Sequence, residues 1–196
     1  MIVNSITGFS ASVRKHQKIL PKFLGEVFKG WEDVGINNYY SSNKDCIIDS
    51  IKFLNYHWPE DALLVGKSLG GIKTWWLLNA YWHHIEGRLE GGSKVGVVLL
   101  DPHGWQIGDG YVGSFGIGDR NLPWNKQWDK WIKADLLKIE VLYQRNKYPM
   151  GAHFEGKDVN TKLPRNATHW NITDIDSSIG RLSEAAIVEM ADWLLK

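Results

Sequence analysis

Short apolar runs alternate along this chain with longer segments in which apolar residues recur at helical spacing. The apolar runs predict strands at residues 2–7, 34–40, 62–65, 94–100 and 139–144, and a further short strand before His169. The periodic segments predict helices at residues 12–28, 45–56, 69–85, 124–136 and 179–195. This alternation is typical of an α/β fold, with a mostly parallel central sheet flanked by helices on both faces.

Local signals refine three of the predicted helices. Pro21 should break or restart the first, because proline lacks the amide hydrogen that an interior turn needs. Asn43 is a candidate cap for the helix at 45–56. The last helix is amphipathic, and its apolar face is formed by Leu182, Ala186, Met190 and Leu194. No linker, repeat or low-complexity tract divides the chain, so residues 1–196 are interpreted as a single domain.

The strand predicted at 62–65 runs directly into Gly66-Lys67-Ser68-Leu69-Gly70-Gly71, and a helical pattern follows. Glycines on both sides of Ser68 remove Cβ atoms that would clash in a tight strand-to-helix turn. A serine in such a turn is held in a strained conformation with its hydroxyl exposed, and the N–H groups of the new helix point at the reacting atoms. We therefore interpret this stretch as a nucleophile elbow, with Ser68 as the nucleophile.

Two other interpretations of this motif have to be weighed. One is a plain glycine-rich turn between a buried strand and a helix. The other is the end of a phosphate-binding P-loop, which Gly66-Lys67-Ser68 resembles, but that loop needs a glycine five residues before Gly66, where Asp61 stands. An aspartate offers neither the backbone freedom nor the charge that a phosphate site needs. Nucleotide binding therefore ranks below hydrolysis.

A serine becomes nucleophilic when a base takes its proton and a third group orients that base. His169 is the best placed base, because it lies between the last predicted strand and the final helix, where parallel sheets carry functional loops. Asp101 is the best placed acid, because it closes the apolar strand expected beside the elbow strand, and Asp158 is the alternative. The simpler interpretation of Asp101 is a turn or capping residue. Structural roles are expected for His16, His57, His83 and His84.

These residues resemble the α/β-hydrolase superfamily over nearly the whole chain, in particular its lipase, esterase and thioesterase branches. The stretch from Gly66 to Gly71 matches their elbow, with lysine where those enzymes more often have histidine or an aromatic residue. Leu100-Asp101-Pro102 is similar to a strand end of the lipase-like branch, and the residues after His169 are similar to the family's histidine loop. The family's acid usually follows the strand ending here at Gln144, where this chain has Asn146, and this departure favours Asp101.

The resemblance also implies a compact hydrolase fold without a large lid, and an oxyanion hole made by two backbone N–H groups. One of them belongs to Leu69, which follows the nucleophile. The other lies in the turn after the first strand, at Phe9 or Ser10, where Gly8 permits a close approach. Phe9 is equally compatible with a place in the core.

Composition narrows the classes of partner. The chain is 43% hydrophobic and 23% charged, as expected of a soluble globular protein, and 23 basic against 22 acidic residues favour neither nucleic acid nor an acidic membrane. Cys46, the only cysteine, excludes an internal disulfide and is expected to be a buried, inert thiol. No paired-cysteine or His-Glu-x-x-His spacing indicates a metal site, and no cofactor motif is present.

The chain contains neither a leader segment nor an apolar run of membrane-spanning length, and a cytoplasmic location is expected. N-glycosylation patterns at Asn166 and Asn171 bracket His169, and glycans there would block it, which favours the same location. The 11 tryptophans are a high share for this length. Their simpler role is core packing. The alternative is an apolar wall for an acyl or aromatic substrate, formed by Trp105, Trp124, Trp128 and Trp131.

Together these features predict a serine hydrolase that cleaves a carboxylic ester or thioester of a small-molecule acyl substrate. Ser68 would form the acyl-enzyme, His169 would act as base and Asp101 as orienting acid, and no cofactor would be needed. Two alternatives stay open: a non-catalytic binding module that uses the tryptophan-rich loops, and an acyltransferase with the same three residues.

Overall fold

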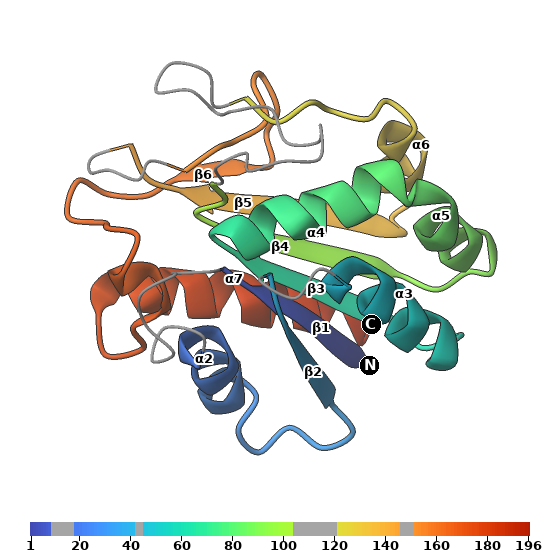
Figure 1. Cartoon of the computed structure of the whole chain (residues 1–196), viewed down its shortest axis with the longest axis horizontal. Coiled ribbons are helices and arrows are strands. Elements are labelled where there is room, and N and C mark those ends of the chain that lie inside the picture. The colour runs from blue at the N-terminus through green and yellow to red at the C-terminus, as the bar shows by residue number, and fades with distance from the viewer. Residues whose placement is uncertain (9–17, 42–44, 104–120, 146–150) are drawn as a thin grey trace.

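The computed structural model describes residues 1–8, 18–41, 45–103, 121–145 and 151–196. Its centre is one six-stranded sheet in which every neighbouring pair is parallel, in the order β2-β1-β3-β4-β5-β6 (Figure 1). The strands are β1 (Ile2–Thr7), β2 (Gly35–Tyr40), β3 (Ala62–Lys67), β4 (Val95–Leu100), β5 (Leu137–Tyr143) and β6 (Asn160–Lys162). The predicted parallel sheet is confirmed.

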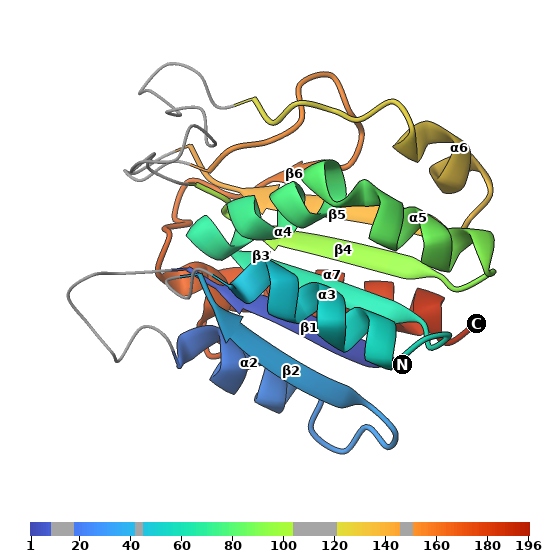
Figure 2. The same ribbon diagram turned by 45° about the vertical axis from the view of Figure 1, so that its right-hand side comes forward.

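Helices cover both faces of this sheet, which Figure 2 shows most clearly. One face carries α3 (Cys46–Tyr56), α4 (Leu69–Ala80), α5 (Trp82–Glu90) and α6 (Trp128–Lys133). The other face carries α2 (Ile19–Val27), the short 3₁₀ helix η1 (Asn171–Thr173) and α7 (Ser178–Leu194). The central strands β1, β3 and β4 are buried along their whole length, because helices cover both of their faces. Most of β3 and all of β4 are correspondingly apolar or glycine, whereas β1 also buries the polar residues Asn4, Ser5 and Thr7.

The strand order reverses at β1, which lies between β2 and β3. The helices that follow β1 and β3 pack on opposite faces of the sheet. In open parallel sheets, ligands bind beyond the carboxyl ends of the strands at such a point. The turn after β1 at Gly8 and the bend after β3 at Ser68 meet at this place. The topology therefore places the Gly66–Gly71 motif where open parallel sheets bind ligands.

Two predicted helices differ in length from those observed. The helix expected at 69–85 is interrupted at Tyr81, whose φ of −113° and ψ of 28° are not helical. This break lets Trp82 turn into the core, where its ring centre lies 6.4 Å from that of Trp128. The helix expected at 124–136 is only Trp128–Lys133, because the backbone of Asp135 takes a φ of +57° and ends it before β5.

Three finer expectations have separate outcomes. Pro21 lies in the first turn of α2, where its missing amide hydrogen removes no helical bond. Asn43 lies outside the described residues, and Asp45 occupies the cap position of α3 without a side-chain cap bond. The assignment of Leu182 to the apolar face of α7 is wrong, because the Leu182 side chain is 43% exposed. In that part of the helix, Ile179 and Ser183 lie on the buried face instead.

Most of the tryptophans in the described residues pack in or against the core, whereas Trp58 and Trp170 are exposed. Trp82 and Trp128 are buried, and Trp75, Trp76, Trp124 and Trp131 are partly buried against the same cluster, whereas Trp105 lies outside the described residues. Cys46 is a buried free thiol as expected, and burial raises its pKa. The expectation of a fold without a large lid depends on residues 104–120, which lie outside the described residues. Within that part, no helix combines the length and apolarity required to cross a bilayer.

Candidate active site

The backbone bends sharply between β3 and α4, and Ser68 occupies the bend. Its φ of 60° and ψ of −131° lie in a region that side chains other than glycine rarely enter. Glycines surround it because nothing larger fits: a Cβ at Gly8 would lie 2.4 Å from Ser68 Cβ, and one at Gly70 would lie 1.8 Å from the carbonyl oxygen of Ile6. The structure thus has the strained strand-to-helix turn that the glycine spacing predicts. The expected exposure of the serine is not observed, because Ser68 is only 6% exposed.

The hydroxyl of Ser68 contacts a histidine that the sequence analysis did not select. Ser68 Oγ lies 3.2 Å from His103 Nε2, and His103 Nδ1 lies 3.1 Å from the backbone oxygen of Asp101. A carbonyl oxygen only accepts hydrogen bonds, so Nδ1 carries the hydrogen of the neutral ring and Nε2 carries the lone pair. His103 therefore accepts the Ser68 hydroxyl hydrogen.

Asp101 binds His169 directly, as the sequence predicts for an orienting acid. His169 Nδ1 lies 2.7 Å from Asp101 Oδ2, and both side chains are buried. The other oxygen of the carboxylate accepts the backbone N–H of Gln144 at 3.2 Å. Since a carboxylate accepts the Nδ1 hydrogen, the lone pair of neutral His169 is on Nε2, as a general base requires.

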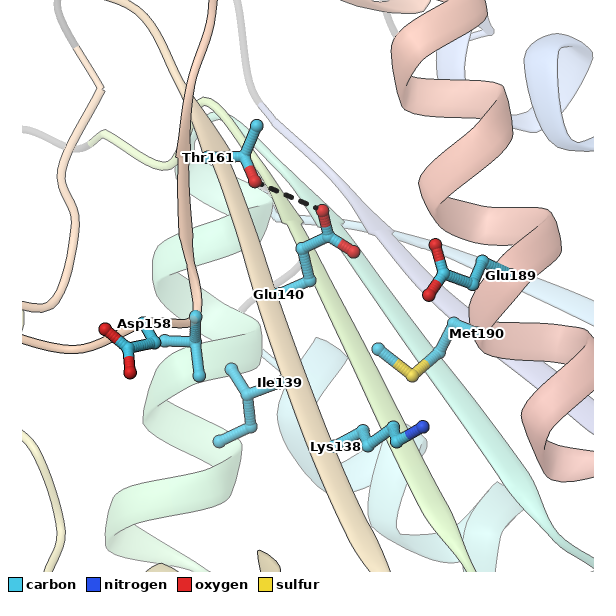
Figure 3. Close-up of a pocket in the computed structure, with 8 residues that line it drawn as sticks. Lys138, Ile139, Glu140, Asp158, Thr161, Glu189 and Met190 are labelled. Atoms are coloured by element: carbon cyan, nitrogen blue, oxygen red, sulfur yellow. Dashed lines mark hydrogen bonds between the residues drawn. The ribbon is translucent and has the colours of Figure 1, made fainter.

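The alternative acid, Asp158, lies elsewhere in the molecule. It lines a pocket of about 300 Å³ beside β5 together with Lys138, Ile139 and Glu140, and Glu189 of α7 lies across that pocket (Figure 3). Burial is the main cause that raises the pKa of Glu140, and the charge of Glu189 adds to it. Of the two carboxylates considered from sequence, the structure brings Asp101 to His169.

The two histidines are in contact with each other. Their ring centres are 4.2 Å apart and their planes are nearly perpendicular. Burial lowers the pKa of His103 to about 4, and the neighbouring His169 acts in the same direction. His103 is therefore neutral at physiological pH. A usable signal for it was present in the sequence, because His103 stands two residues after the acid at the end of the strand next to the elbow.

Asp101, His103 and His169 also have donor atoms within 4.8 Å of one another, a group that could in principle hold a metal ion. Two ligands of one zinc ion, each at about 2.0–2.2 Å in tetrahedral geometry, lie roughly 3.4 Å apart. The contact between His169 Nδ1 and Asp101 Oδ2 is only 2.7 Å, which is the length of a charge-assisted hydrogen bond. These two atoms are thus arranged as an acid–base pair rather than as two ligands of one ion.

One of the two expected oxyanion donors is in the described part of the chain. Leu69 is the first residue of α4, and the N–H groups of a first helical turn have no partner within the helix. Phe9 and Ser10 lie outside the described residues, but Gly8, which precedes them, is packed directly against Ser68. One end of the turn expected to supply the second donor is therefore next to the nucleophile.

Gly151→Ala is expected to displace the acid. A Cβ at Gly151 would lie 2.2 Å from Asp101 Oδ1 and 3.0 Å from Tyr143 Cβ, so the carboxylate would have to move. Misplacement of a positioned group by about 1 Å costs about 100-fold in rate, so a reaction that depends on the Asp101–His169 pair should slow by about this factor, and the protein should lose about 1–3 kcal/mol of stability. The control is Gly25→Ala, which meets nothing within 4 Å on α2. Full activity in Gly151→Ala would contradict this role.

In comparisons with known proteins, no family model and no curated protein matches this chain. Its function is therefore inferred from the geometry of the site.

Proposed function

We propose that this protein is a serine hydrolase that cleaves a carboxylic ester or thioester of a small-molecule acyl substrate. The observation that carries the proposal is the combination of a serine in a strained strand-to-helix bend with an Asp101–His169 pair beside its histidine partner. A serine needed only for folding gains nothing from such a backbone, because glycine would adopt it without strain.

In the proposed reaction, Ser68 Oγ attacks the acyl carbon and its proton passes to Nε2 of His169. The Asp101 carboxylate stabilises the imidazolium, and the same proton then leaves with the alcohol or thiol. Water hydrolyses the resulting acyl-enzyme by the same steps. The N–H of Leu69 is proposed to bind the oxyanion, together with Phe9 or Ser10, and no cofactor takes part.

His103 has a different role in this scheme. With a pKa of about 4 it is a weak base, and it accepts the Ser68 hydrogen bond in the resting site. His169 is the stronger base because a carboxylate, rather than a backbone carbonyl, supports its Nδ1 hydrogen. The proposed reaction requires the Ser68 hydroxyl to pass from His103 to His169, whose rings are in contact with each other.

A fluorophosphonate probe tests the proposal on the intact protein. We expect one covalent adduct, located on Ser68 by peptide mass spectrometry, because only a serine activated by a base reacts with the probe. A binding module on the same fold would stay unlabelled. We also propose that the substrate is a small acyl compound and that the protein is cytoplasmic, and both proposals rest on the sequence.

A further inference from the structure

A buried cation lies beneath this site and takes no part in the proton transfers. Lys67 is the last residue of β3, directly before Ser68, and it is only 5% exposed. Its side chain extends toward η1, where Nζ donates a hydrogen bond of 2.6 Å to Thr173 Oγ1. These residues are 106 positions apart in the sequence, so the bond joins the elbow strand to the segment that follows His169.

Within the described part of the chain, the Lys67 ammonium has no ion-pair partner. Among the described residues, no carboxylate oxygen lies within 4.0 Å of its nitrogen. Burial lowers its pKa to about 8, and the charge of Asp101 acts in the opposite direction. A buried cation without a contacting anion costs stability, and an apolar side chain of similar size is often neutral or better at such a position. Packing alone therefore does not explain a lysine here.

Lys67 interacts electrostatically with two titratable groups of the site, Asp101 and His103. The carboxylate of Asp101, at the end of β4, is the described charge that acts on it. Lys67 acts in turn on the imidazole of His103. Its hydrogen-bond partner Thr173 is neutral and buried, in the 3₁₀ turn that begins two residues after His169. The lysine thus contacts the segment that carries the base and faces the acid that orients it.

We propose that Lys67 is a positioning residue of the hydrolase site, which fixes the His169 segment through Thr173 and supplies the positive charge opposite the buried Asp101 carboxylate. This inference rests on the proposed function. Burial also argues against a P-loop role for Lys67, because its ammonium points into the protein, toward Thr173, and is not available to bind a phosphate.

Three variants of the full-length protein test the proposal. Lys67→Met removes the charge and the hydrogen bond, whereas Thr173→Val removes only the hydrogen bond. Lys94→Met is the control. Lys94 is a partly buried lysine whose Nζ, like that of Lys67, donates a hydrogen bond, here to the carbonyl of Trp193, but it lies just before β4 at the other end of the sheet. NMR titration of the His103 and His169 imidazoles gives a readout that does not require turnover, and p-nitrophenyl ester hydrolysis gives the second.

Removing a nearby positive charge makes an imidazole easier to protonate, so Lys67→Met should raise the titration midpoints of the site by at least about half a unit. Thr173→Val and Lys94→Met should leave them in place. The acid limb of kcat/KM should move to higher pH in Lys67→Met alone, since the base must be neutral to act, and kcat should fall in Lys67→Met and Thr173→Val.

Unshifted midpoints in Lys67→Met, or equal shifts in Thr173→Val, would overturn the role of Lys67. If Lys67→Met does not fold, Lys67→Gln replaces it with the same expected shift. Absence of ester hydrolysis in the unaltered protein would instead contradict the proposed function, and the NMR titration would still decide whether Lys67 acts on the two histidines.

Discussion

Ser68→Ala is expected to lower kcat for p-nitrophenyl ester hydrolysis by about 10⁵-fold, because no other group can form the acyl-enzyme. The variant should fold normally, since alanine is smaller and takes the same strained backbone. The assay compares purified variants, with thermal unfolding as the test of folding. Ser183→Ala is the matched control, because Ser183 is a buried serine of α7 whose hydroxyl has no hydrogen-bond partner in the described structure. Unchanged hydrolysis in Ser68→Ala would remove the basis of the enzyme proposal.

Replacing His169 and His103 separately is expected to give effects of very different size. His169→Asn can keep a donor to Asp101 but lacks Nε2, and we expect a loss in kcat of about 10³-fold or more. Asp101→Asn should cost about 10⁴-fold, because an amide favours the wrong tautomer of the ring. His103→Gln keeps an acceptor near the Nε2 position yet cannot take up a proton, so its loss should stay below about tenfold if His103 only holds the resting hydroxyl.

The pH dependence separates the two histidines further. The pKa of His103 is lowered to about 4 by burial, so its titration lies below the range in which a functioning base changes state. The acid limb of kcat/KM should therefore keep its position in His103→Gln. A large loss in His103→Gln with nearly full activity in His169→Asn would show that the direct partner of Ser68 in the structure is also its base.

Much of the fold was predictable because the signals are local. A strand buried on both faces needs a run of apolar residues, and Ala62–Val65 and Val95–Leu100 are such runs. The parallel sheet follows from their alternation with amphipathic helices. The break at Tyr81 and the exposure of Leu182 were not predictable, because they depend on which neighbour a helix packs against.

The candidate site, like the fold, could be predicted from the sequence only in part. The glycines around Ser68 indicate a tight bend from sequence alone, and chain position identifies His169 as a candidate base and Asp101 and Asp158 as candidate acids. Three features of the site depend on contacts between residues 35 or more positions apart: which histidine contacts Ser68, which carboxylate reaches His169, and which residue the Lys67 ammonium binds.

The sequence by itself determined where the chain forms strands, where it bends, and which residue stands at the bend, because periodicity and glycine spacing act over a few neighbouring residues. Only the tertiary structure decided that Asp101 rather than Asp158 binds His169, that His103 accepts the Ser68 hydroxyl, and that Lys67 is buried against Thr173. The physical reason is that these bonds form where the ends of β3 and β4 and the segment before α7 are brought together. Strand order and helix packing determine that these segments lie together, and no local sequence pattern encodes either of them.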